Sequence, residues 1–352
     1  MRSLRPLLLL ILLLAAVTGA AAALVAARMS AAGPHDAPVL IDVPPGQSLR
    51  GVLNDLAASG AVREPRLVEW WVRLADRTPR VRVGRYEIPA GASPREILQQ
   101  LDEGRVLLES LTVIEGTRYA DLRRALAAHA GVRQTLRGVD DAELMRRLGE
   151  PGVHPEGRFF PDTYRFAYGT TDFELLRLAH RRMRERLEAA WAARADDLPL
   201  GGPDEALALA SIVEKESALA SERPRVAGVF VQRLRLGMRL QSDPTVIYGL
   251  GERYDGDIRD RDLTTDTPYN SYTRKGLPPT PISLPGEAAL RAATRPQETG
   301  ELFFVATGLP DGSHTFSRTY DEHRAAVRLM LQRQRERRQS AGSTESATAD
   351  GR

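Results

Sequence analysis

Hydrophobic residues are unevenly distributed along the chain, and the longest apolar run lies near its start. From Pro6 to Ala27 every residue is apolar or small, and Thr18 carries the only hydroxyl group of the run. A helix needs about 20 apolar residues to cross the hydrocarbon core of a bilayer. The pattern therefore predicts a transmembrane helix over residues 6–27.

The charges before this run predict its orientation. Arg2, Arg5 and the amino terminus precede it, and positive charge tends to stay on the cytoplasmic side. Residues 1–5 are then cytoplasmic and the bulk of the chain is extracytoplasmic. A cleaved signal peptide is the alternative, with small residues at Ala20–Ala23 for cleavage. Its apolar part is usually about 7–15 residues long, so the length favours a retained anchor, followed by a linker over 28–38.

A short pattern then occurs three times: a strand, a glycine turn, a Ser or Thr suited to N-capping, and a helix. The three helices are expected over residues 49–58, 94–101 and 119–128. Such self-similarity indicates small βα units packed together. The units resemble the LysM-type glycan-binding module, which would occupy residues 39–108. A plain structural αβ subdomain explains the repeat almost as well.

The rest of the chain is mostly helical in pattern, which makes the expected fold class α+β. Helices are expected over residues 140–148, 173–195, 205–219, 223–236 and 320–335, and a strand over 302–306. Residues 241–286 are rich in Pro, Gly, Thr and Tyr, as is typical of loops that form a site. Residues 336–352 are predicted to be a disordered tail.

Composition excludes several classes of function. The chain has 352 residues and a formal net charge of +3, an excess of base too small to indicate a nucleic-acid partner. It has no cysteine, which excludes thiol catalysis and thiolate zinc sites. No His and carboxylate cluster has metal-ligand spacing, so no metal and no cofactor are expected.

One carboxylate lies on an apolar helix face. At about 100° per residue, Glu216 falls on the same side of its helix as Leu209, Ile212, Val213 and Leu219. Burial raises the pKa of a carboxyl group, as a general acid requires near neutral pH. Spacing alone leaves a second interpretation equally open, a buried glutamate paired with an arginine. Glu214 points the opposite way and is predicted to be solvated or paired along the helix.

The segment around Glu216 resembles the signature of the endolytic murein transglycosylase, or YceG-like, family. It reads A-S-I-V-E-K-E-S over Ala210–Ser217. Other segments resemble further blocks of that family, in the family's order: Glu156–Tyr164, Gly237–Gly249, Tyr269–Tyr272 followed by Gly276–Pro279, and His314–Phe316. Together these blocks cover most of the chain after the anchor.

The resemblance implies a lysozyme-like catalytic domain over 109–335, joined to the LysM-like subdomain. It implies that Glu216 is the catalytic acid and base, and that substrate is bound by Gln241, Tyr269 and Asn270. Tyr272 is a further substrate-binding candidate, although core packing explains it equally well. Asp243 is another, although a turn or helix cap before Pro244 is the simpler explanation. His314 is a weaker candidate for substrate contact.

The activity implied is cleavage of the MurNAc–GlcNAc bond of nascent peptidoglycan strands, leaving 1,6-anhydro-MurNAc ends and ending strand elongation. Such a reaction needs one carboxyl group, whereas hydrolytic glycosidases usually need two. The implied partners are peptidoglycan glycan strands, the cytoplasmic (inner) membrane and peptidoglycan synthases, with the catalytic domain periplasmic. A hydrolytic muramidase using Glu216 with Asp243, and a non-catalytic wall-binding scaffold, are the alternatives.

Overall fold

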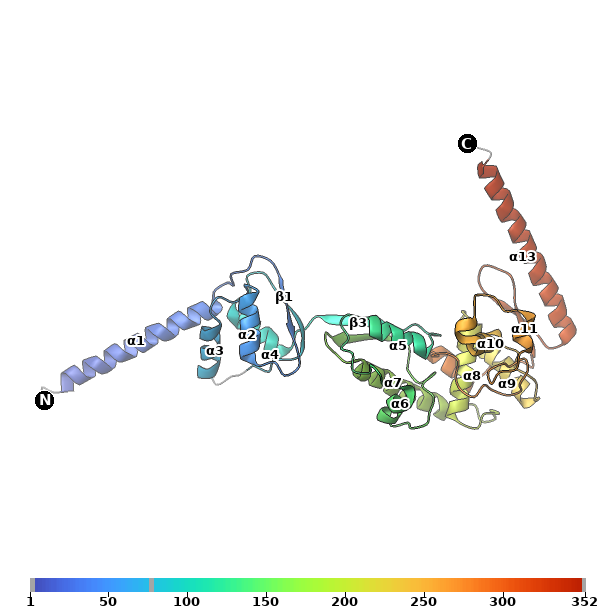
Figure 1. Ribbon diagram of the computed structural model, residues 1–352, viewed down its shortest axis with the longest axis horizontal. Coiled ribbons are helices and arrows are strands. Elements are labelled where there is room, and N and C mark those ends of the chain that lie inside the picture. The colour runs from blue at the N-terminus through green and yellow to red at the C-terminus, as the bar shows by residue number, and fades with distance from the viewer. Residues whose placement is uncertain (1–3, 76–78, 350–352) are drawn as a thin grey trace. The chain divides into compact units, whose positions relative to one another are not determined.

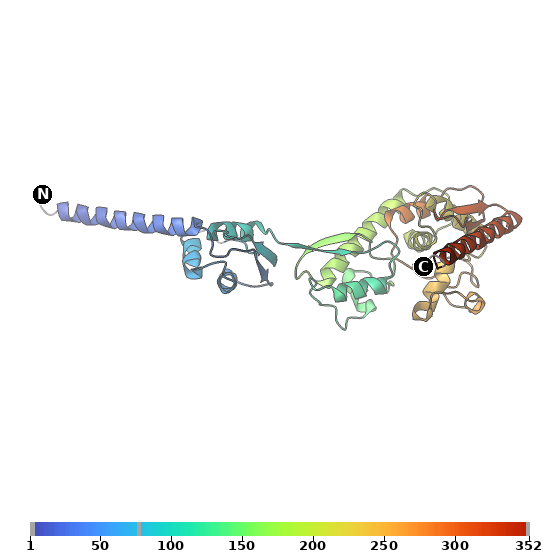
Figure 2. The same ribbon diagram turned by 90° about the horizontal axis from the view of Figure 1, so that it is seen from above.

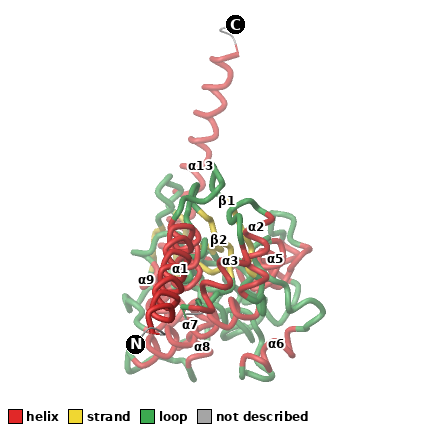
Figure 3. Tube along the Cα trace, turned by 90° about the vertical axis from the view of Figure 1, so that its left-hand side faces the viewer, coloured by secondary structure: helices red, strands yellow, loops and turns green. Residues whose placement is uncertain are grey.

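The computed structural model describes residues 4–75 and 79–349, with side chains described over 7–75 and 79–337. Within these residues the fold is mixed α and β and mostly helical, with three small two-stranded sheets (Figure 3). The predicted α+β class is confirmed at this level. The chain forms two compact units. Unit 1 comprises Met1–Leu111, His129–Arg133 and Arg165–Thr171, and unit 2 comprises Thr112–Ala128, Gln134–Tyr164 and Asp172–Arg352.

The apolar run at the start of the chain forms one helix, α1 (Leu4–Ser30), which Figures 1 and 2 both show unbroken. Its segment Leu7–Ser30 contains an 18-residue window with a mean hydropathy of 2.7, none of which is buried by the rest of the protein. The segment is therefore long and apolar enough to cross a membrane. A single-pass anchor and a signal sequence are both consistent with such a helix.

The segment predicted to be a linker is packed rather than free. Met29, near the end of α1, is 1% exposed in the core of unit 1, and Val25 packs against the same core. The backbone N–H of Gly33 donates to the carbonyl of Gly91 at 3.0 Å, and the N–H of Gly91 donates to the carbonyl of His35 at 2.8 Å. Parts of the segment 28–38 therefore pack against unit 1, and Met29 gains burial because the helix continues into the core.

Unit 1 is built from short strands and capped helices. Its elements after α1 are β1 (Val39–Val43), α2 (Leu49–Ala58), α3 (Pro65–Leu74), β2 (Gly84–Ile88) and α4 (Pro94–Glu103). β1 and β2 pair antiparallel, with Val39 opposite Ile88. The side chain of Ser48 caps α2, and Ser93 forms a capping box with Glu96 at α4, so both predicted caps are confirmed. The hydrophobic pattern does not predict α3.

The third predicted copy of the pattern is formed by β3 (Leu108–Thr112) and α5 (Tyr119–Ala128). β3 pairs with β4 (Thr163–Ala167). Helix α6 (Asp141–Leu148) lies between α5 and β4 along the chain, and α7 (Asp172–Ala192) follows β4. The long charged helix expected over 173–195 is thus present with slightly different ends.

The second half of unit 2 surrounds a central helix (Figure 1). The elements are α8 (Pro203–Glu216), α9 (Arg223–Arg235), α10 (Asp243–Leu250), the 3₁₀ helix η1 (Gly251–Arg253), α11 (Asp260–Thr264), α12 (Glu287–Thr294), β5 (Phe303–Ala306), β6 (His314–Ser317) and α13 (Tyr320–Ala349). α8 packs against α7, α9, α10 and α12. Every residue from Ala206 to Glu214 is buried, so this part of α8 has no solvent-facing side.

Two helix ends differ from their predicted positions. α8 ends at Glu216, because Ser217 has an extended backbone with φ −127° and ψ 119°. Leu219, expected on the same helical stripe as Glu216, lies beyond this end. α13 continues to Ala349, into the predicted disordered tail. The tail begins with Glu, Arg and Gln residues, which favour helix, while 350–352 lie outside the described residues.

Candidate active site

Glu216 lies where α8 stops, and the end of the helix turns its side chain toward a cavity. The cavity has a volume of about 440 Å³ and is lined by Glu216 together with Gln241, Asp243, Tyr272 and His314. Aromatic and apolar residues of β5 and α13 complete the lining, among them Phe304. The Glu216 side chain is half-buried. A carboxyl group thus faces an open cavity lined by polar and aromatic side chains, as is common in carbohydrate sites.

The surroundings of Glu216 favour its protonated form. The pKa of Glu216 is raised to about 7, mainly by burial and also by the nearby charge of Asp243. The Ser242 hydroxyl opposes this effect by donating a hydrogen bond to Glu216 Oε1 at 2.5 Å, and the charge of Arg233 also opposes it. Glu216 makes no ion pair among the described residues. A carboxyl group with this pKa exchanges its proton readily near neutral pH.

Arg233 is buried beside the cavity, and its guanidinium group donates hydrogen bonds to backbone carbonyl groups. Its Nε donates to the carbonyl of Leu302 at 2.7 Å and its guanidinium donates to the carbonyl of Leu240 at 2.5 Å. These bonds connect α9 to β5 and to the turn that carries Gln241. The arginine therefore positions one wall of the cavity and leaves the Glu216 carboxyl group able to accept and release a proton.

The turn between α9 and α10 is strained at Gln241. Gln241 has a φ of 52°, the only positive value for a non-glycine residue among those described. Its N–H donates to the carbonyl of Ser271 at 3.1 Å, and the N–H of Ser242 donates to the hydroxyl of Ser271 at 2.9 Å. The left-handed conformation costs free energy for a residue with a Cβ, so the surrounding hydrogen bonds hold Gln241 at the cavity wall.

Asp243 and Tyr272 meet across the cavity wall. The Tyr272 hydroxyl donates to Asp243 Oδ1 at 2.5 Å. Burial and the neighbouring Asp243 carboxylate both raise the pKa of Tyr272, so this hydroxyl keeps its proton. Asp243 is also the first residue of α10, as the turn or cap interpretation expects. Both residues line the cavity with Glu216 and Gln241, so four of the six predicted site residues are brought together.

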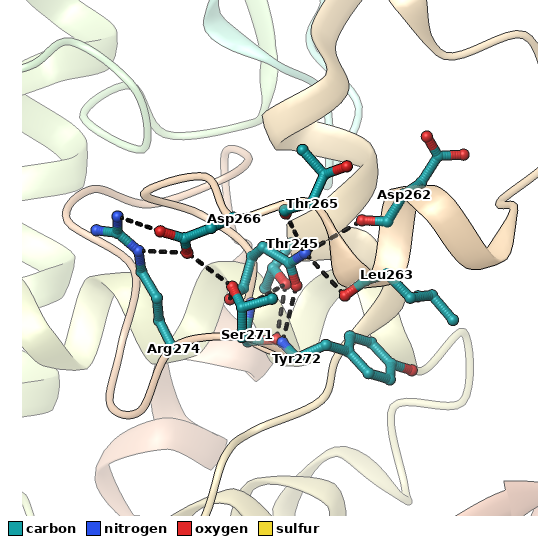
Figure 4. Close-up of polar contacts among 10 residues, drawn as sticks. Thr245, Asp262, Leu263, Thr265, Asp266, Ser271, Tyr272 and Arg274 are labelled. Carbon is teal, nitrogen blue, oxygen red and sulfur yellow. Dashed lines mark hydrogen bonds and ion pairs between the residues drawn. The ribbon is translucent and has the colours of Figure 1, made fainter.

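Asn270 is placed differently from the prediction. It is 1% exposed, and its side-chain amide donates to the carbonyls of Asp262, Leu263 and Thr265 at 3.1, 3.1 and 2.7 Å. Its side-chain oxygen accepts from the N–H of Tyr272 at 2.9 Å. Figure 4 shows these carbonyl groups converging on one point of the loop, with the Asp266–Arg274 ion pair beside them. Asn270 therefore holds the loop that presents Tyr272.

Tyr269 is also separate from the cavity lining. Its ring packs edge-on against the ring of Tyr248, with centroids 4.8 Å apart. Its hydroxyl shares a hydrogen bond with Thr280 Oγ1 at 2.9 Å. The contacts of Tyr269 therefore belong to the packing between α10 and the loop after it.

The sequence interpretation missed two residues of this site and gave a third, His314, only as a weaker candidate. Ser242, which holds Glu216, was not singled out, and neither was Arg233. His314 lines the cavity, and its Nδ1 lies 2.7 Å from Glu222 Oε2. The sequence signal for Ser242 and Arg233 is weak, because their roles arise from contacts between elements that are distant along the chain.

Glu214 corrects the sequence prediction most directly. It was expected to be solvated or paired along the helix, yet it is buried with its side chain 4% exposed. Arg223 donates to its Oε1 at 2.6 Å, and the N–H of Gly286 donates to its Oε2 at 2.9 Å. The prediction failed because a helical wheel assumes one solvent-facing side, which the middle of α8 lacks. The buried, arginine-paired glutamate is therefore Glu214.

Glu156 is a second carboxyl group with a raised pKa. It is 3% exposed, and burial raises its pKa to about 7. Its oxygens accept from the Tyr119 N–H at 3.0 Å and from the Tyr248 hydroxyl at 3.2 Å. These bonds link the start of α5 to α10, outside the Glu216 cavity lining. Among the described residues, no group of three His, Asp or Glu side chains is placed to hold a metal ion.

Comparison with known proteins identifies the family. Residues 41–329 match the YceG-like family. An endolytic murein transglycosylase of Bacillus subtilis is 28% identical over 82% of this chain and 83% of its own length. One of Streptococcus pneumoniae is 24% identical over 81% of this chain and 57% of its own length.

A solved structure supports the same assignment. The crystal structure of a YceG-like protein from Listeria monocytogenes aligns with a TM-score of 0.52 and 26% identity, covering 82% of this chain and 98% of that one. The family match alone spans most of the chain, and the motifs around Glu216 lie inside it. The resemblance of the sequence motifs is thereby confirmed, and the chain belongs to the YceG-like family, with relatives named endolytic murein transglycosylases.

Proposed function

We propose that this protein is a peptidoglycan lytic transglycosylase that cuts MurNAc–GlcNAc bonds within nascent glycan strands, with Glu216 as acid and then base. One observation carries the proposal. A half-buried carboxyl group with a pKa of about 7 faces a cavity, and it is held by the Ser242 hydroxyl rather than by an arginine. Glu214 differs because Arg223 pairs with it, and Glu156, whose pKa is also raised to about 7, differs because it lies outside the cavity lining.

The chemistry follows from one proton moving to and from one carboxyl group. Protonated Glu216 donates its proton to the glycosidic oxygen as the bond to the anomeric carbon breaks. The N-acetyl group of the same sugar stabilises the positive charge that develops there. The Glu216 carboxylate then takes the proton of the C6 hydroxyl while that oxygen bonds to the anomeric carbon. The product is a 1,6-anhydro sugar, Glu216 regains its proton, and no water is consumed.

The other cavity residues have separate roles in this proposal. Gln241, Asp243 and Tyr272 line the cavity with Glu216 and bind the sugars through hydrogen bonds and ring contact. The negative charge of Asp243 also keeps the pKa of Glu216 high. Asn270 and Tyr269 are positioning residues, because their side chains hold the loop before and at Tyr272.

The first part of the chain is proposed to bring this site to its substrate. α1 acts as a retained single-pass anchor in the cytoplasmic membrane, with both units on the periplasmic side. Unit 1, with its paired short strands and capped helices, is LysM-like and binds glycan. Anchoring keeps the enzyme where new strands emerge from peptidoglycan synthases, its proposed partners, so that cleavage ends strand elongation.

The test is digestion of purified glycan strands with mass analysis of the products. The wild-type protein should release fragments with 1,6-anhydro ends, and Glu216→Gln should reduce this release at least about a hundredfold. Glu185→Gln, an exposed position on α7, is the control and should leave the rate unchanged. If Glu216→Gln still formed anhydro ends at the wild-type rate, Glu216 would not be the acid.

The same measurement separates the two alternatives. A hydrolytic muramidase would use Asp243, which lines the same cavity, to activate water, and its products would be heavier than anhydro products by one water. A scaffold would bind strands and leave their length unchanged. Either result with folded wild-type protein would contradict the proposal.

A further inference from the structure

Helix α3 carries an apolar stripe that is left uncovered. Leu67, Trp70 and Leu74 follow one another at helical spacing, and Trp70 and Leu74 are 54% and 67% exposed. The opposite side of the helix is fully used, because Val68 and Val72 are each 2% exposed in the core of unit 1. Exposed apolar residues that gather on one helix face indicate a binding surface. We therefore expect this stripe to contact a partner.

The place where α1 meets unit 1 indicates that the membrane is this partner. The side chains of α1 are exposed from Leu7 to Leu24, and packing against unit 1 begins at Val25. At about 1.5 Å per residue, the exposed stretch is roughly 27 Å long, close to the thickness of about 30 Å of a hydrocarbon core. Unit 1 therefore begins at the depth where the hydrocarbon core ends and the lipid headgroups start.

The end of α1 is joined directly to α3. Arg28, in the last turn of α1, forms an ion pair of 2.9 Å with Glu64, the N-cap residue of α3. Figures 1 and 2 both show α3 lying crosswise to α1, at the end of unit 1 from which α1 projects. A helix in this place lies along a membrane surface when α1 crosses the membrane.

Charge around α3 matches an anionic lipid surface. Arg63, Arg66 and Arg73 are exposed, while the acidic residues of the segment, Glu64 and Glu69, are each bound to arginine. A cavity of about 390 Å³ between α1 and α3 is lined by Arg28 and Arg63 as well as by apolar residues such as Met29 and Leu67. Arginine beside tryptophan at the headgroup level is typical of segments that bind membrane interfaces.

We infer that α3 docks on the periplasmic surface of the membrane, with Trp70 and Leu74 inserted among the headgroups and Arg63 and Arg66 on anionic phospholipid. The inference rests on the proposed anchoring by α1 and adds a second membrane contact to it. Unit 1 is then held against the bilayer instead of swinging from it. This fixes the height and orientation of the proposed glycan-binding unit above the membrane.

Tryptophan fluorescence tests the insertion, since the chain has three tryptophans. The full-length protein is reconstituted into phosphatidylcholine vesicles containing phosphatidylglycerol and lipids brominated on the acyl chain. Trp71→Phe/Trp191→Phe leaves Trp70 as the probe, and Trp70→Phe/Trp71→Phe leaves Trp191, on α7 of unit 2, as the reference. Trp70 should be quenched by bromine at least about twofold more than Trp191 and should be shielded from aqueous acrylamide, as for an interfacial indole.

Extraction at alkaline pH separates this inference from the anchor. If the protein is washed out of the vesicles, the anchoring proposal fails. If it resists extraction and Trp70 is still quenched no more than Trp191, the anchor stands and docking of α3 is overturned. Such a result would leave the stripe to a protein or glycan partner.

The proposed preference for anionic lipid is tested by comparing vesicles with and without phosphatidylglycerol. Replacing phosphatidylglycerol by phosphatidylcholine should weaken the quenching of Trp70, because fewer phosphate charges then face Arg63 and Arg66. Arg63→Gln/Arg66→Gln in the Trp70 probe protein should lose this dependence on lipid charge. Equal quenching of the parent probe in the two lipids would overturn the anionic preference.

Discussion

Helix α8 carries two glutamates, Glu214 and Glu216, that differ in their partners and in their access to the cavity. Glu214 is buried and tied to Arg223 and to the Gly286 N–H. Glu216, two positions later, is half-buried at the helix end, and a single Ser242 hydroxyl holds it beside a cavity. Burial raises the pKa of both groups. The Gly286 N–H and the Arg223 charge lower the pKa of Glu214, and the Ser242 hydroxyl and the Arg233 charge lower that of Glu216. What surrounds a carboxyl group, rather than burial alone, distinguishes a structural residue from an acid.

The largest effect on folding is expected on the Glu214 side. Glu214→Ala removes the carboxylate from a guanidinium whose side chain is 8% exposed. Breaking a buried ion pair costs about 3 kcal/mol or more of unfolding free energy, and the contact that Arg223 keeps, with Glu115, is longer at 3.5 Å. Urea denaturation should show this loss, whereas Glu216→Gln should show none, because Gln still accepts the Ser242 bond.

A double variant sharpens this result. Glu214→Leu/Arg223→Met replaces both charges by apolar side chains and should recover much of the stability lost in Glu214→Ala, since it leaves no buried charge without a partner. If the double variant were as unstable as Glu214→Ala, packing at these positions, and not the unpaired charge, would explain the loss.

The Glu216 side should dominate the pH dependence of activity. Because the acid must be protonated and its pKa is about 7, kcat/KM should fall about tenfold per pH unit above pH 7. Ser242→Ala should move this fall to higher pH, because the Ser242 hydrogen bond lowers the pKa of Glu216. Asp243→Asn should move it to lower pH, because the charge of Asp243 raises that pKa. Shifts of both variants in one direction would contradict this electrostatic account.

The same ionisation affects stability. The folded-state pKa of Glu216, about 7, lies above its ordinary value of 4.5, so the folded protein binds this proton more tightly than the unfolded chain. Its contribution is present below pH 4.5 and is lost as the pH rises through 7. Glu216→Gln should therefore match the wild type near pH 4.5 and exceed it at pH 8, by at most about 3 kcal/mol. Thermal unfolding at the two pH values checks this difference.

Local chemistry explains which parts of the fold the sequence predicts. Ser48 and Ser93 cap helices where glycine turns follow short strands, and these signals need no knowledge of distant residues. The burial of Glu214 and the packing of Met29 depend on which elements meet in space, and helical periodicity therefore assigned Glu214 incorrectly. Glu216 was identified for a partly mistaken reason, because Leu219, part of the predicted stripe, lies beyond the end of the helix.

The candidate site shows the same division. The sequence interpretation named Gln241 from the motif resemblance and Asp243 and Tyr272 as further candidates, and all three line the cavity with Glu216. It did not distinguish them from Asn270, whose amide faces the carbonyls of its own loop. A polar residue within a motif can bind substrate or hold the backbone, and only the direction of its side chain separates these roles.

A moderate effect is expected at Tyr272. Tyr272→Phe keeps the ring at the cavity and removes the hydroxyl that donates to Asp243. If the hydroxyl and Asp243 bind sugar, KM should rise about three- to tenfold with little change in kcat, because a bond made equally in ground and transition states is lost. Tyr254→Phe, after η1 and outside the cavity lining, is the control and should leave KM unchanged. A fall in kcat alone would assign Tyr272 to the chemical step instead.

The smallest expected effect concerns the strained turn beside Glu216. Gln241 holds a φ of 52°, a conformation that costs a non-glycine residue about 1 kcal/mol or more. Gln241→Gly should relieve this cost and stabilise the protein, while Gln241→Ala keeps the strain. Both lose the amide, so both should lose sugar binding to the same extent. If glycine gave no more stability than alanine in urea denaturation, the turn would not be strained, and the position of Gln241 would need another explanation. If glycine stabilised the fold while binding fell in both variants, the turn at the cavity would be keeping a costly backbone conformation for the sake of the Gln241 side chain, whereas Glu214 serves folding alone.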